Sequence, residues 1–320
     1  MPYLSILGII FFSLILIKSA DILSTHLKVL AKKTKLGGFF LTSLIVGLAT
    51  SFPELFVGIT SALSGVPNLS LGNVIGANIA NVTLVAGGAA IIGGSIKIKN
   101  HAYASDLLHA FLASMTPLFL LMDNSLSRVD GLILIALYGY YNVSILRKRM
   151  PHMVQQEGNI FSSFLRKFKH NNSGKELMYI FGSTALILFS AQMIVSFGKE
   201  IASGLGISLL LVGLLIVSIG TTLPELTVDI KAVMKKDTEL FLGNMLGSIV
   251  ANATLVIGLV ALISPIVINA YTDYVLSTVF FLLLFLYFYF FVRTKERLDR
   301  WEGFMLVGVY ILFMVIEFSR

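Results

Sequence analysis

One stretch of this sequence occurs twice, 171 residues apart. Residues 45–94 and 216–265 align without a gap and are identical at 21 of 50 positions. The most distinctive matches belong to two motifs, Thr-x-x-Pro-Glu and Gly-Asn-x-x-Gly, and each copy contains both motifs. General apolar similarity would match leucine and valine, whereas these matches fall on proline, glycine and polar residues. The chain therefore consists of two copies of one unit, and its fold must accommodate both.

The composition indicates the surroundings of both copies. Hydrophobic residues make up 56% of the chain and charged residues only 13%, whereas about a quarter of the residues of a soluble domain are charged. Apolar runs of about 20 residues, long enough to cross a bilayer, recur throughout. We therefore predict an all-α integral membrane protein, and we expect the first run, which no basic segment precedes, to be kept as a helix. The ten predicted spans are 3–23, 39–63, 69–93, 105–122, 129–146, 177–198, 208–233, 239–264, 273–292 and 302–318, and the fourth is expected to be interrupted at Pro117.

The ten spans divide into five for each copy. The first copy occupies residues 1–146, the second occupies 177–320, and a polar, basic loop at 147–176 links them. Because five is odd, the two copies enter the membrane from opposite sides. Inverted repeats of this kind are typical of transporters with a binding site near the bilayer midplane. The sequence thus predicts ten transmembrane helices arranged as two inverted five-helix repeats.

The lysines and arginines predict the orientation in the membrane. Twenty of them lie in or beside the loops of one side, which includes the central loop, and three lie on the other side with both termini. Basic loops face the cytoplasm, so we expect a multi-pass protein of the cell membrane with its central loop cytoplasmic and both termini outside. The net charge of +7 is spread over these short loops and does not indicate a nucleic-acid partner. Apart from the lipid bilayer, no obligate partner is indicated.

Each copy places one carboxylate, Glu54 or Glu225, within an apolar span. A charged side chain at membrane depth is costly unless something compensates it, and two in equivalent positions require a cation between them. The preceding prolines, Pro53 and Pro224, cannot donate a backbone hydrogen bond, so we expect the helix to be interrupted there. The carbonyl oxygens expected to be freed are those of Ala49 and Gly220, and the hydroxyls beside them are those of Thr50, Ser51, Thr221 and Thr222. Carboxylate, hydroxyl and carbonyl oxygens suit a hard cation such as Ca²⁺ or Na⁺.

The Gly-Asn-x-x-Gly motifs add small residues and amides. We expect their glycines, Gly72, Gly76, Gly243 and Gly247, to allow close helix approach. Asn81 and Asn252, two turns after the motif asparagines, are interpreted as ligands of a cation or of its water, with interhelical hydrogen bonding as the alternative. For Asn73 and Asn244 the preference is reversed, because we place them at the start of a helix, where they could cap it.

Asp229 lies one helical turn beyond Glu225, and its counterpart in the first copy is Gly58. Two interpretations are open. The carboxylate could gather cations at the cytoplasmic mouth of the site, or it could pair with Lys231, with Lys235 or with a neighbouring helix.

Together the paired motifs resemble the two alpha-repeats of the cation/calcium exchanger superfamily, specifically its sodium/calcium exchanger branch of the prokaryotic type. The resemblance covers both repeats and implies the same ten-span plan with both termini outside. The proton/calcium branch typically has Gly-Asn-x-x-Glu where this chain has Thr50-Ser51-Phe52-Pro53-Glu54. This difference favours Na⁺ as the counter-ion.

The resemblance also implies roles for individual residues. Glu54 and Glu225 would be the shared Ca²⁺ ligands, with Thr50 and Thr221 beside them. The Na⁺ sites would be completed by the hydroxyls of Ser51, Thr222 and Ser248 and by the backbone carbonyls of Gly47 and Ser218. Ala77 stands where the family commonly has a serine, and Asn252 stands where some members have an aspartate. These departures leave the Na⁺ stoichiometry open and argue against a K⁺ requirement.

The expected function is that of an antiporter that exchanges Ca²⁺ for Na⁺ by alternating access at a shared two-glutamate site. The family implies that spans one and six move across a fixed eight-helix core, and no cofactor is expected besides the transported ions. The alternative is an exchanger of H⁺ for Ca²⁺, or for another divalent cation, at the same glutamates. A channel is a further alternative, although a single occluded site between inverted repeats favours alternating access. An enzyme is not indicated, because the chain has no cysteine and shows neither a nucleophile–base pair nor a histidine-rich metal site.

Overall fold

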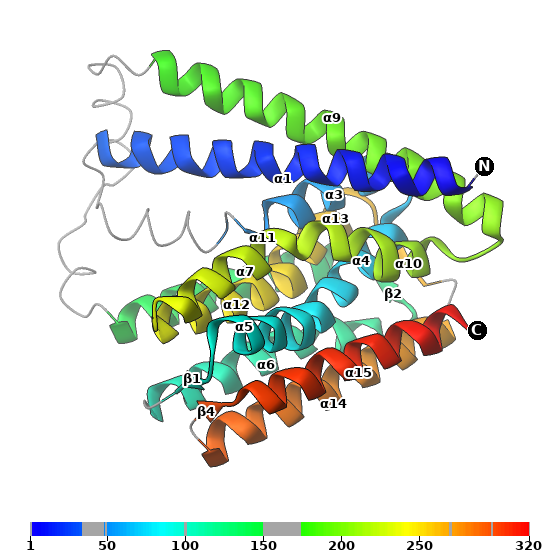
Figure 1. Ribbon diagram of the computed structural model, residues 1–320. Helices are drawn as coiled ribbons and strands as arrows, with labels where there is room; N and C mark the ends of the chain where they lie inside the picture. The colour runs from blue at the N-terminus through cyan, green and yellow to red at the C-terminus, as the bar shows by residue number, and fades with distance from the viewer. Residues whose placement is uncertain are drawn as a thin grey trace.

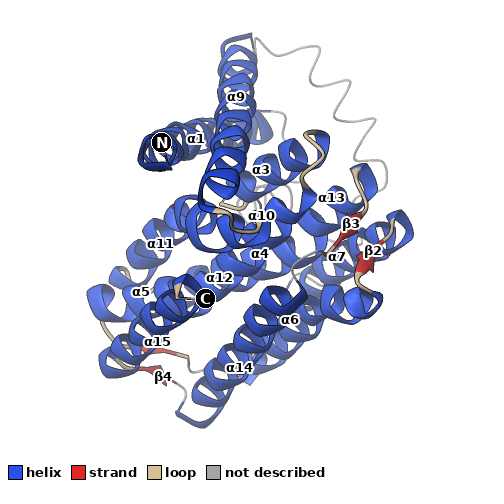
Figure 2. Cartoon of the chain, turned by 90° about the vertical axis from the view of Figure 1, so that its right-hand side faces the viewer, coloured by secondary structure: helices blue, strands red, loops and turns tan. Residues whose placement is uncertain are grey.

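The computed structural model of the chain describes residues 2–33, 48, 50–98, 101–149, 174–268, 271–295 and 297–319. These parts of the chain are almost entirely helical (Figure 1 and Figure 2). The helical elements of the first repeat are α1 (Pro2–Lys33), α3 (Phe52–Leu63), α4 (Pro67–Ala80), η1 (Asn81–Val85), α5 (Ala86–Gly93), α6 (His101–Leu120), η2 (Leu121–Asp123) and α7 (Arg128–Arg149). Those of the second are α9 (Gly174–Leu205), α10 (Leu209–Val212), η3 (Gly213–Val217), α11 (Ser218–Met234), α12 (Thr238–Val250), η4 (Ala251–Val256), α13 (Ile257–Ile263), α14 (Tyr271–Lys295) and α15 (Arg300–Phe318).

Eight helical segments of the described chain are long and apolar enough to cross a membrane, and each coincides with a predicted span. Of the predicted span 39–63, the structure describes residues 48 and 50–63, which include the short apolar helix α3. The predicted span 129–146 forms the 22-residue helix α7, which is less apolar than the others. The count of ten spans therefore remains a prediction. The expected interruption at Pro117 is wrong, since α6 continues through this residue to Leu120.

Helices α1 and α9, the first of each repeat, lie side by side along one flank of the molecule (Figure 1). They run in opposite directions: the Ser5 hydroxyl donates to Glu200 at 2.8 Å, while the rings of His26 and Tyr179 stack near the other ends with centroids 4.2 Å apart. Their apolar side chains form a hydrophobic cluster separate from the one that holds the remaining helices together. The antiparallel pair is the arrangement that inverted repeats require.

Short strands join the two repeats. β1 (Ile96–Lys97) pairs antiparallel with β4 (Arg297–Leu298), and β2 (Ser125–Leu126) pairs antiparallel with β3 (Ile266–Val267). With the offset of 171 residues between the repeats, β1 corresponds to β3 and β2 to β4, each within one residue. The two pairings are thus the same contact repeated by the internal symmetry, and they join the third, fourth and fifth spans of the two repeats.

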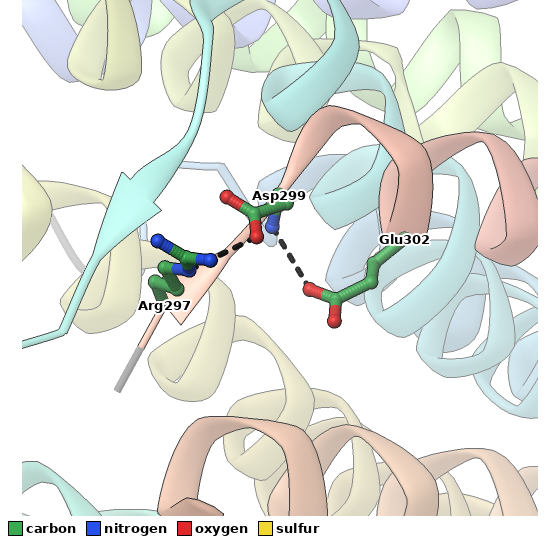
Figure 3. A network of polar contacts seen from close by, with 3 residues as sticks. All are labelled: Arg297, Asp299 and Glu302. Atoms are coloured by element: carbon green, nitrogen blue, oxygen red, sulfur yellow. Dashed lines mark hydrogen bonds and ion pairs between the residues drawn. The ribbon is translucent and has the colours of Figure 1, made fainter. Parts of the chain in front are cut away.

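The junction between β4 and α15 is fixed by local polar contacts (Figure 3). Asp299 caps α15 in a capping box, in which its own backbone N–H donates to Glu302 Oε2 at 2.9 Å. Arg297 Nε lies 3.0 Å from Asp299 Oδ2. A capping residue contributes about 1 kcal/mol to helix stability, while a partly exposed ion pair contributes less. The box therefore sets where α15 begins.

Close packing of α4 against the α10–η3 segment depends on glycine. A Cβ at Gly72 would lie 1.9 Å from the backbone oxygen of Leu210, and one at Gly76 would lie 2.3 Å from that of Leu214. The expected small-residue contact is therefore present in the first repeat. No described atom lies within 4 Å of a Cβ built at Gly243 or Gly247. Their counterpart contact would involve residues 39–46, which lie outside the described residues.

Candidate cation-binding site

The two repeated carboxylates occupy equivalent places in the packed interior. Glu54 lies in the first turn of α3 and Glu225 lies within α11. Both side chains have 0% of their surface exposed, and none of their four carboxylate oxygens has a hydrogen-bond partner among the described residues. The charges of the two groups act on each other electrostatically. Two buried, unsatisfied carboxylates are costly in a membrane protein, so their pairing indicates a cation site.

Two symmetric hydrogen bonds bring the motifs of opposite repeats together. Thr50 Oγ1 donates to Asn244 Oδ1 at 3.1 Å, and Thr221 Oγ1 donates to Asn73 Oδ1 at 3.1 Å. Each bond joins the Thr-x-x-Pro-Glu motif of one repeat to the Gly-Asn-x-x-Gly motif of the other. The two threonines predicted to flank the glutamates are thereby held at the junction of the repeats.

Asn73 and Asn244 are not helix caps. α4 begins at Pro67 and α12 at Thr238, so both asparagines lie inside their helices, and each amide oxygen accepts from a threonine of the other repeat. The interhelical hydrogen bonding favoured for them is confirmed, and their expected place at a helix start is wrong. Proline occupies the beginning of α4, where its missing N–H costs no helical bond, and Asp237 caps α12.

The hydroxyls predicted to complete the site are buried but differ in their contacts. Ser51 Oγ has no partner among the described residues, whereas Thr222 Oγ1 donates to the carbonyl of Ser218 at 2.6 Å. The Ser218 carbonyl also accepts from Thr221 at 3.3 Å. Ser248 Oγ lies 3.1 Å from Thr50 Oγ1. The predicted carbonyl ligand of Gly47 lies outside the described residues.

Asn81 and Asn252 are fully buried in the π-helical turns η1 and η4. Neither amide atom of Asn81 has a partner among the described residues. Asn252 Nδ2 donates to Asn78 Oδ1 at 3.3 Å. The oxygen of the same amide, Asn252 Oδ1, has no partner in the described structure. Single π-turns within helices are frequent at functional sites, which is consistent with the predicted role of the two asparagines.

Asn78, which the sequence did not single out, is bonded to one of the predicted ligands. Its Nδ2 donates to the backbone oxygen of Ile249 at 3.3 Å, while its Oδ1 holds the amide of Asn252. Ile249 is also the repeat counterpart of Asn78, so self-alignment shows no shared polar residue at this position. The signal available was a polar residue two positions beyond the Gly-Asn-x-x-Gly motif, present in only one repeat.

The helix is not interrupted at Pro224, so that expectation is wrong. α11 runs without a break from Ser218 to Met234, and the irregular turn lies before it, at η3. A proline removes one backbone donor, and the surrounding packing of α11 tolerates that loss. In the first repeat Pro53 occupies the first turn of α3, and Ala49 lies outside the described residues.

Asp229 is as deeply buried as the two glutamates. Its Oδ1 accepts from Asn244 Nδ2 at 2.8 Å, and its Oδ2 has no partner among the described residues. Lys231 and Lys235 are both exposed, so the proposed pairing of Asp229 with these lysines is wrong. Pairing with a neighbouring helix is confirmed through the amide of Asn244 on α12.

The comparison with known families agrees with this geometry. A family model described as sodium/calcium exchanger protein matches residues 4–147 and 175–319, which together make up most of the chain. The chain belongs to this family. It is a multi-pass membrane transporter of the sodium/calcium exchanger family, built from two inverted repeats, and the family is not a class of enzymes.

Known proteins resemble this family member over its whole length. It is 26% identical to the sodium/calcium exchanger MaX1 of Methanosarcina acetivorans, with 98% of this chain and 97% of the relative covered. It is 28% identical to the inner membrane protein YrbG of Escherichia coli, with 95% and 93% covered. Among solved structures, the sodium-calcium exchanger NCX_Mj shares the fold, with a TM-score of 0.63, 23% identity and 98% of both chains covered.

Proposed function

We propose that this family member exchanges Ca²⁺ for Na⁺ by alternating access at one shared site, formed by Glu54 and Glu225. One observation supports the proposal most directly. In a sodium/calcium exchanger family fold, two equivalent carboxylates are fully buried and make no hydrogen bond to any described residue. A membrane protein tolerates such groups when a transported cation compensates their charge.

The groups around the glutamates fit this cargo. Hydroxyl, amide and carboxylate oxygens are the ligands that Ca²⁺ and Na⁺ take. In the described chain, no group of three acidic or histidine side chains gathers as a metal cluster. The proposed ligands are therefore the two glutamates together with neutral oxygens, which are those of Thr50, Thr221, Ser51, Thr222, Asn81, Asn252, Ser248 and the carbonyls of Gly47 and Ser218.

The charge of the two glutamates couples the release of Ca²⁺ to the binding of Na⁺. Two ionised glutamates carry a formal charge of −2, which one Ca²⁺ or several Na⁺ can neutralise, and one pair of carboxylates cannot hold both sets of ions. Ca²⁺ therefore leaves as Na⁺ enters. If a cycle moves one net charge, the membrane potential contributes about 2.3 kcal/mol per 100 mV.

The separate packing of α1 and α9 supports alternating access. These helices share a hydrophobic cluster of their own, which meets the rest of the bundle through few buried side chains, among them Val57, Leu69 and Val212. The third, fourth and fifth spans of the two repeats are joined to each other by both strand pairs. We expect the α1–α9 pair to move across this unit, with the central loop on the cytoplasmic side of the cell membrane and both termini outside.

The counter-ion is tested in proteoliposomes loaded with Na⁺ and diluted into Na⁺-free medium containing radiolabelled Ca²⁺. An outward Na⁺ gradient should drive Ca²⁺ uptake, and collapse of the pH gradient with a protonophore should leave the uptake unchanged when the membrane potential is clamped. Uptake driven by a pH gradient without Na⁺ would instead establish exchange of H⁺ for Ca²⁺ at the same glutamates.

A further inference from the structure

A third carboxylate lies beside the shared site without a role in the exchange described above. Asp229 is fully buried on α11, one helical turn from Glu225, and the charges of these two side chains act on each other. Its Oδ1 accepts from Asn244 Nδ2, while its Oδ2 has no partner among the described residues. An acceptor-only oxygen in this environment is costly unless a cation or a donor meets it.

The first repeat shows that the fold does not require this carboxylate. Its counterpart is Gly58, where a Cβ would lie 3.0 Å from Ser70 Oγ and 3.0 Å from Val256 Cγ1. That position is filled by packing, and Nδ2 of Asn73, the counterpart of Asn244, has no partner in the described structure. Asp229 is thus an addition to one half of a symmetric site.

We propose that Asp229 holds a Na⁺ of its own, shared with Glu225 and separate from the position between the two glutamates. The proposal rests on the exchange function proposed above. The three carboxylates do not gather around one point in the described structure, so Asp229 is not a third ligand of the same Ca²⁺. Asp229 and Glu225 lie on the same face of α11, because residues four apart on a helix are neighbours.

The formal charges of the three carboxylates predict that the Na⁺ at Asp229 stays bound when Ca²⁺ binds. With all three groups ionised the formal charge is −3, so one Ca²⁺ between the glutamates leaves one negative charge. A single Na⁺ at Asp229 neutralises that charge. Ca²⁺ binding therefore does not displace this Na⁺. The position lies toward the C-terminal end of α11, where Lys231 and, just after the helix, Lys235 are exposed, and this is the side expected to face the cytoplasm.

The test is equilibrium binding of radiolabelled Na⁺ to the purified full-length protein, with and without saturating Ca²⁺. In the unaltered protein we expect Ca²⁺ to displace every Na⁺ but one. Asp229→Asn keeps an amide oxygen that can accept from Asn244 and removes only the charge, so it should lose this Ca²⁺-resistant Na⁺ while still binding Ca²⁺. Glu239→Gln, which removes an exposed carboxylate from α12, should retain it.

The outcomes separate the two proposals. A Ca²⁺-resistant Na⁺ that persists in Asp229→Asn, or that is absent from the unaltered protein, would overturn the assignment of Asp229. Failure of Ca²⁺ to displace any Na⁺ would instead contradict exchange at the shared site. Retained Ca²⁺ binding by Asp229→Asn shows that the variant is folded, and Asp229→Ser, which keeps a hydroxyl and no charge, must give the same loss of Na⁺.

Discussion

The hydroxyl groups at the junction of the repeats are oriented by their donors and acceptors. A hydroxyl has one proton and two lone pairs. Thr50 donates its proton to Asn244 Oδ1, so Ser248 must be the donor in its contact with Thr50. Asn244 is itself oriented because its Nδ2 donates to Asp229 Oδ1. This chain of bonds leaves oxygen lone pairs, rather than protons, available to a cation.

Asn78 provides a residue-scale prediction. Asn78→Ala removes the acceptor that holds the Asn252 amide and the donor to the Ile249 carbonyl. We expect a loss of about 1–3 kcal/mol in the free energy of unfolding, because buried polar partners are left unsatisfied, and weaker Ca²⁺ binding because Asn252 is no longer oriented. Thermal unfolding in detergent and calorimetric Ca²⁺ titration measure both effects.

The matched control is Asn142→Ala on α7. This substitution also removes an amide donor to a backbone oxygen, that of Tyr138, and α7 contributes none of the proposed ligands. Ca²⁺ affinity should be unchanged in the control. Equal Ca²⁺ affinities in the two variants would show that Asn78 does not position Asn252.

At the scale of elements, glycine packing and π-turns set where the side chains of the site lie. Gly213 in η3 meets the backbone oxygen of Leu69 so closely that a Cβ would lie 2.1 Å from it. Together with Gly72 and Gly76 this contact brings α4 against η3, immediately before the α11 segment that carries Thr221 and Glu225. The position of the second glutamate relative to Asn73 thus depends on backbone contacts that only glycine permits.

Gly72→Ala tests this dependence. The added Cβ would meet backbone rather than a movable side chain, so we expect a loss of at least about 3 kcal/mol in the free energy of unfolding, at the upper end of overpacking costs. Gly139→Ala in α7 has open space around the added atom and should be neutral or stabilising by up to about 1 kcal/mol, since alanine favours helix. Thermal unfolding compares the two, and similar stabilities would refute the close approach.

Some of these elements could be predicted from the sequence and others could not. The repeated Thr-x-x-Pro-Glu and Gly-Asn-x-x-Gly motifs predicted that Thr50, Thr221 and both glutamates are buried in equivalent places, because symmetry and charge in an apolar span leave little choice. The π-turns have no comparable signature, since one extra residue shifts the helical periodicity and these spans are apolar on most sides, so the shift leaves no visible mark. The effect of Pro224 was misjudged because surrounding contacts, which are not local, decide whether a helix continues past a lost hydrogen bond.

At the scale of the whole molecule, the internal symmetry organises both the framework and the site. The pairing of β1 with β4 and that of β2 with β3 are symmetry-related, as are the hydrogen bonds of Thr50 and Thr221. The departures from symmetry are single residues: Asn78, Ser248 and Asp229 have Ile249, Ala77 and Gly58 as counterparts. A symmetric framework suits access from both sides, and these residues make the two halves of the site chemically different.

The orientation of the whole chain is tested by single cysteines. The native sequence has no cysteine, so labelling has no background. Asn171→Cys in the central loop should react with a membrane-impermeant reagent only from the cytoplasmic side, and a cysteine added after Arg320 only from outside. Labelling of both from the same side would contradict an odd number of spans in the second repeat, and with it the inverted arrangement.

The central claim, that both ions use Glu54 and Glu225, is tested most directly by Ca²⁺ binding to the purified protein during titration with Na⁺. We predict one bound Ca²⁺ that Na⁺ releases cooperatively, and loss of this binding in Glu54→Gln and in Glu225→Gln, since each variant removes a charge and points an amide donor at the cation. Glu239→Gln should bind and release Ca²⁺ like the unaltered protein. Ca²⁺ binding that survives either substitution, or that Na⁺ does not reverse, would contradict a shared site.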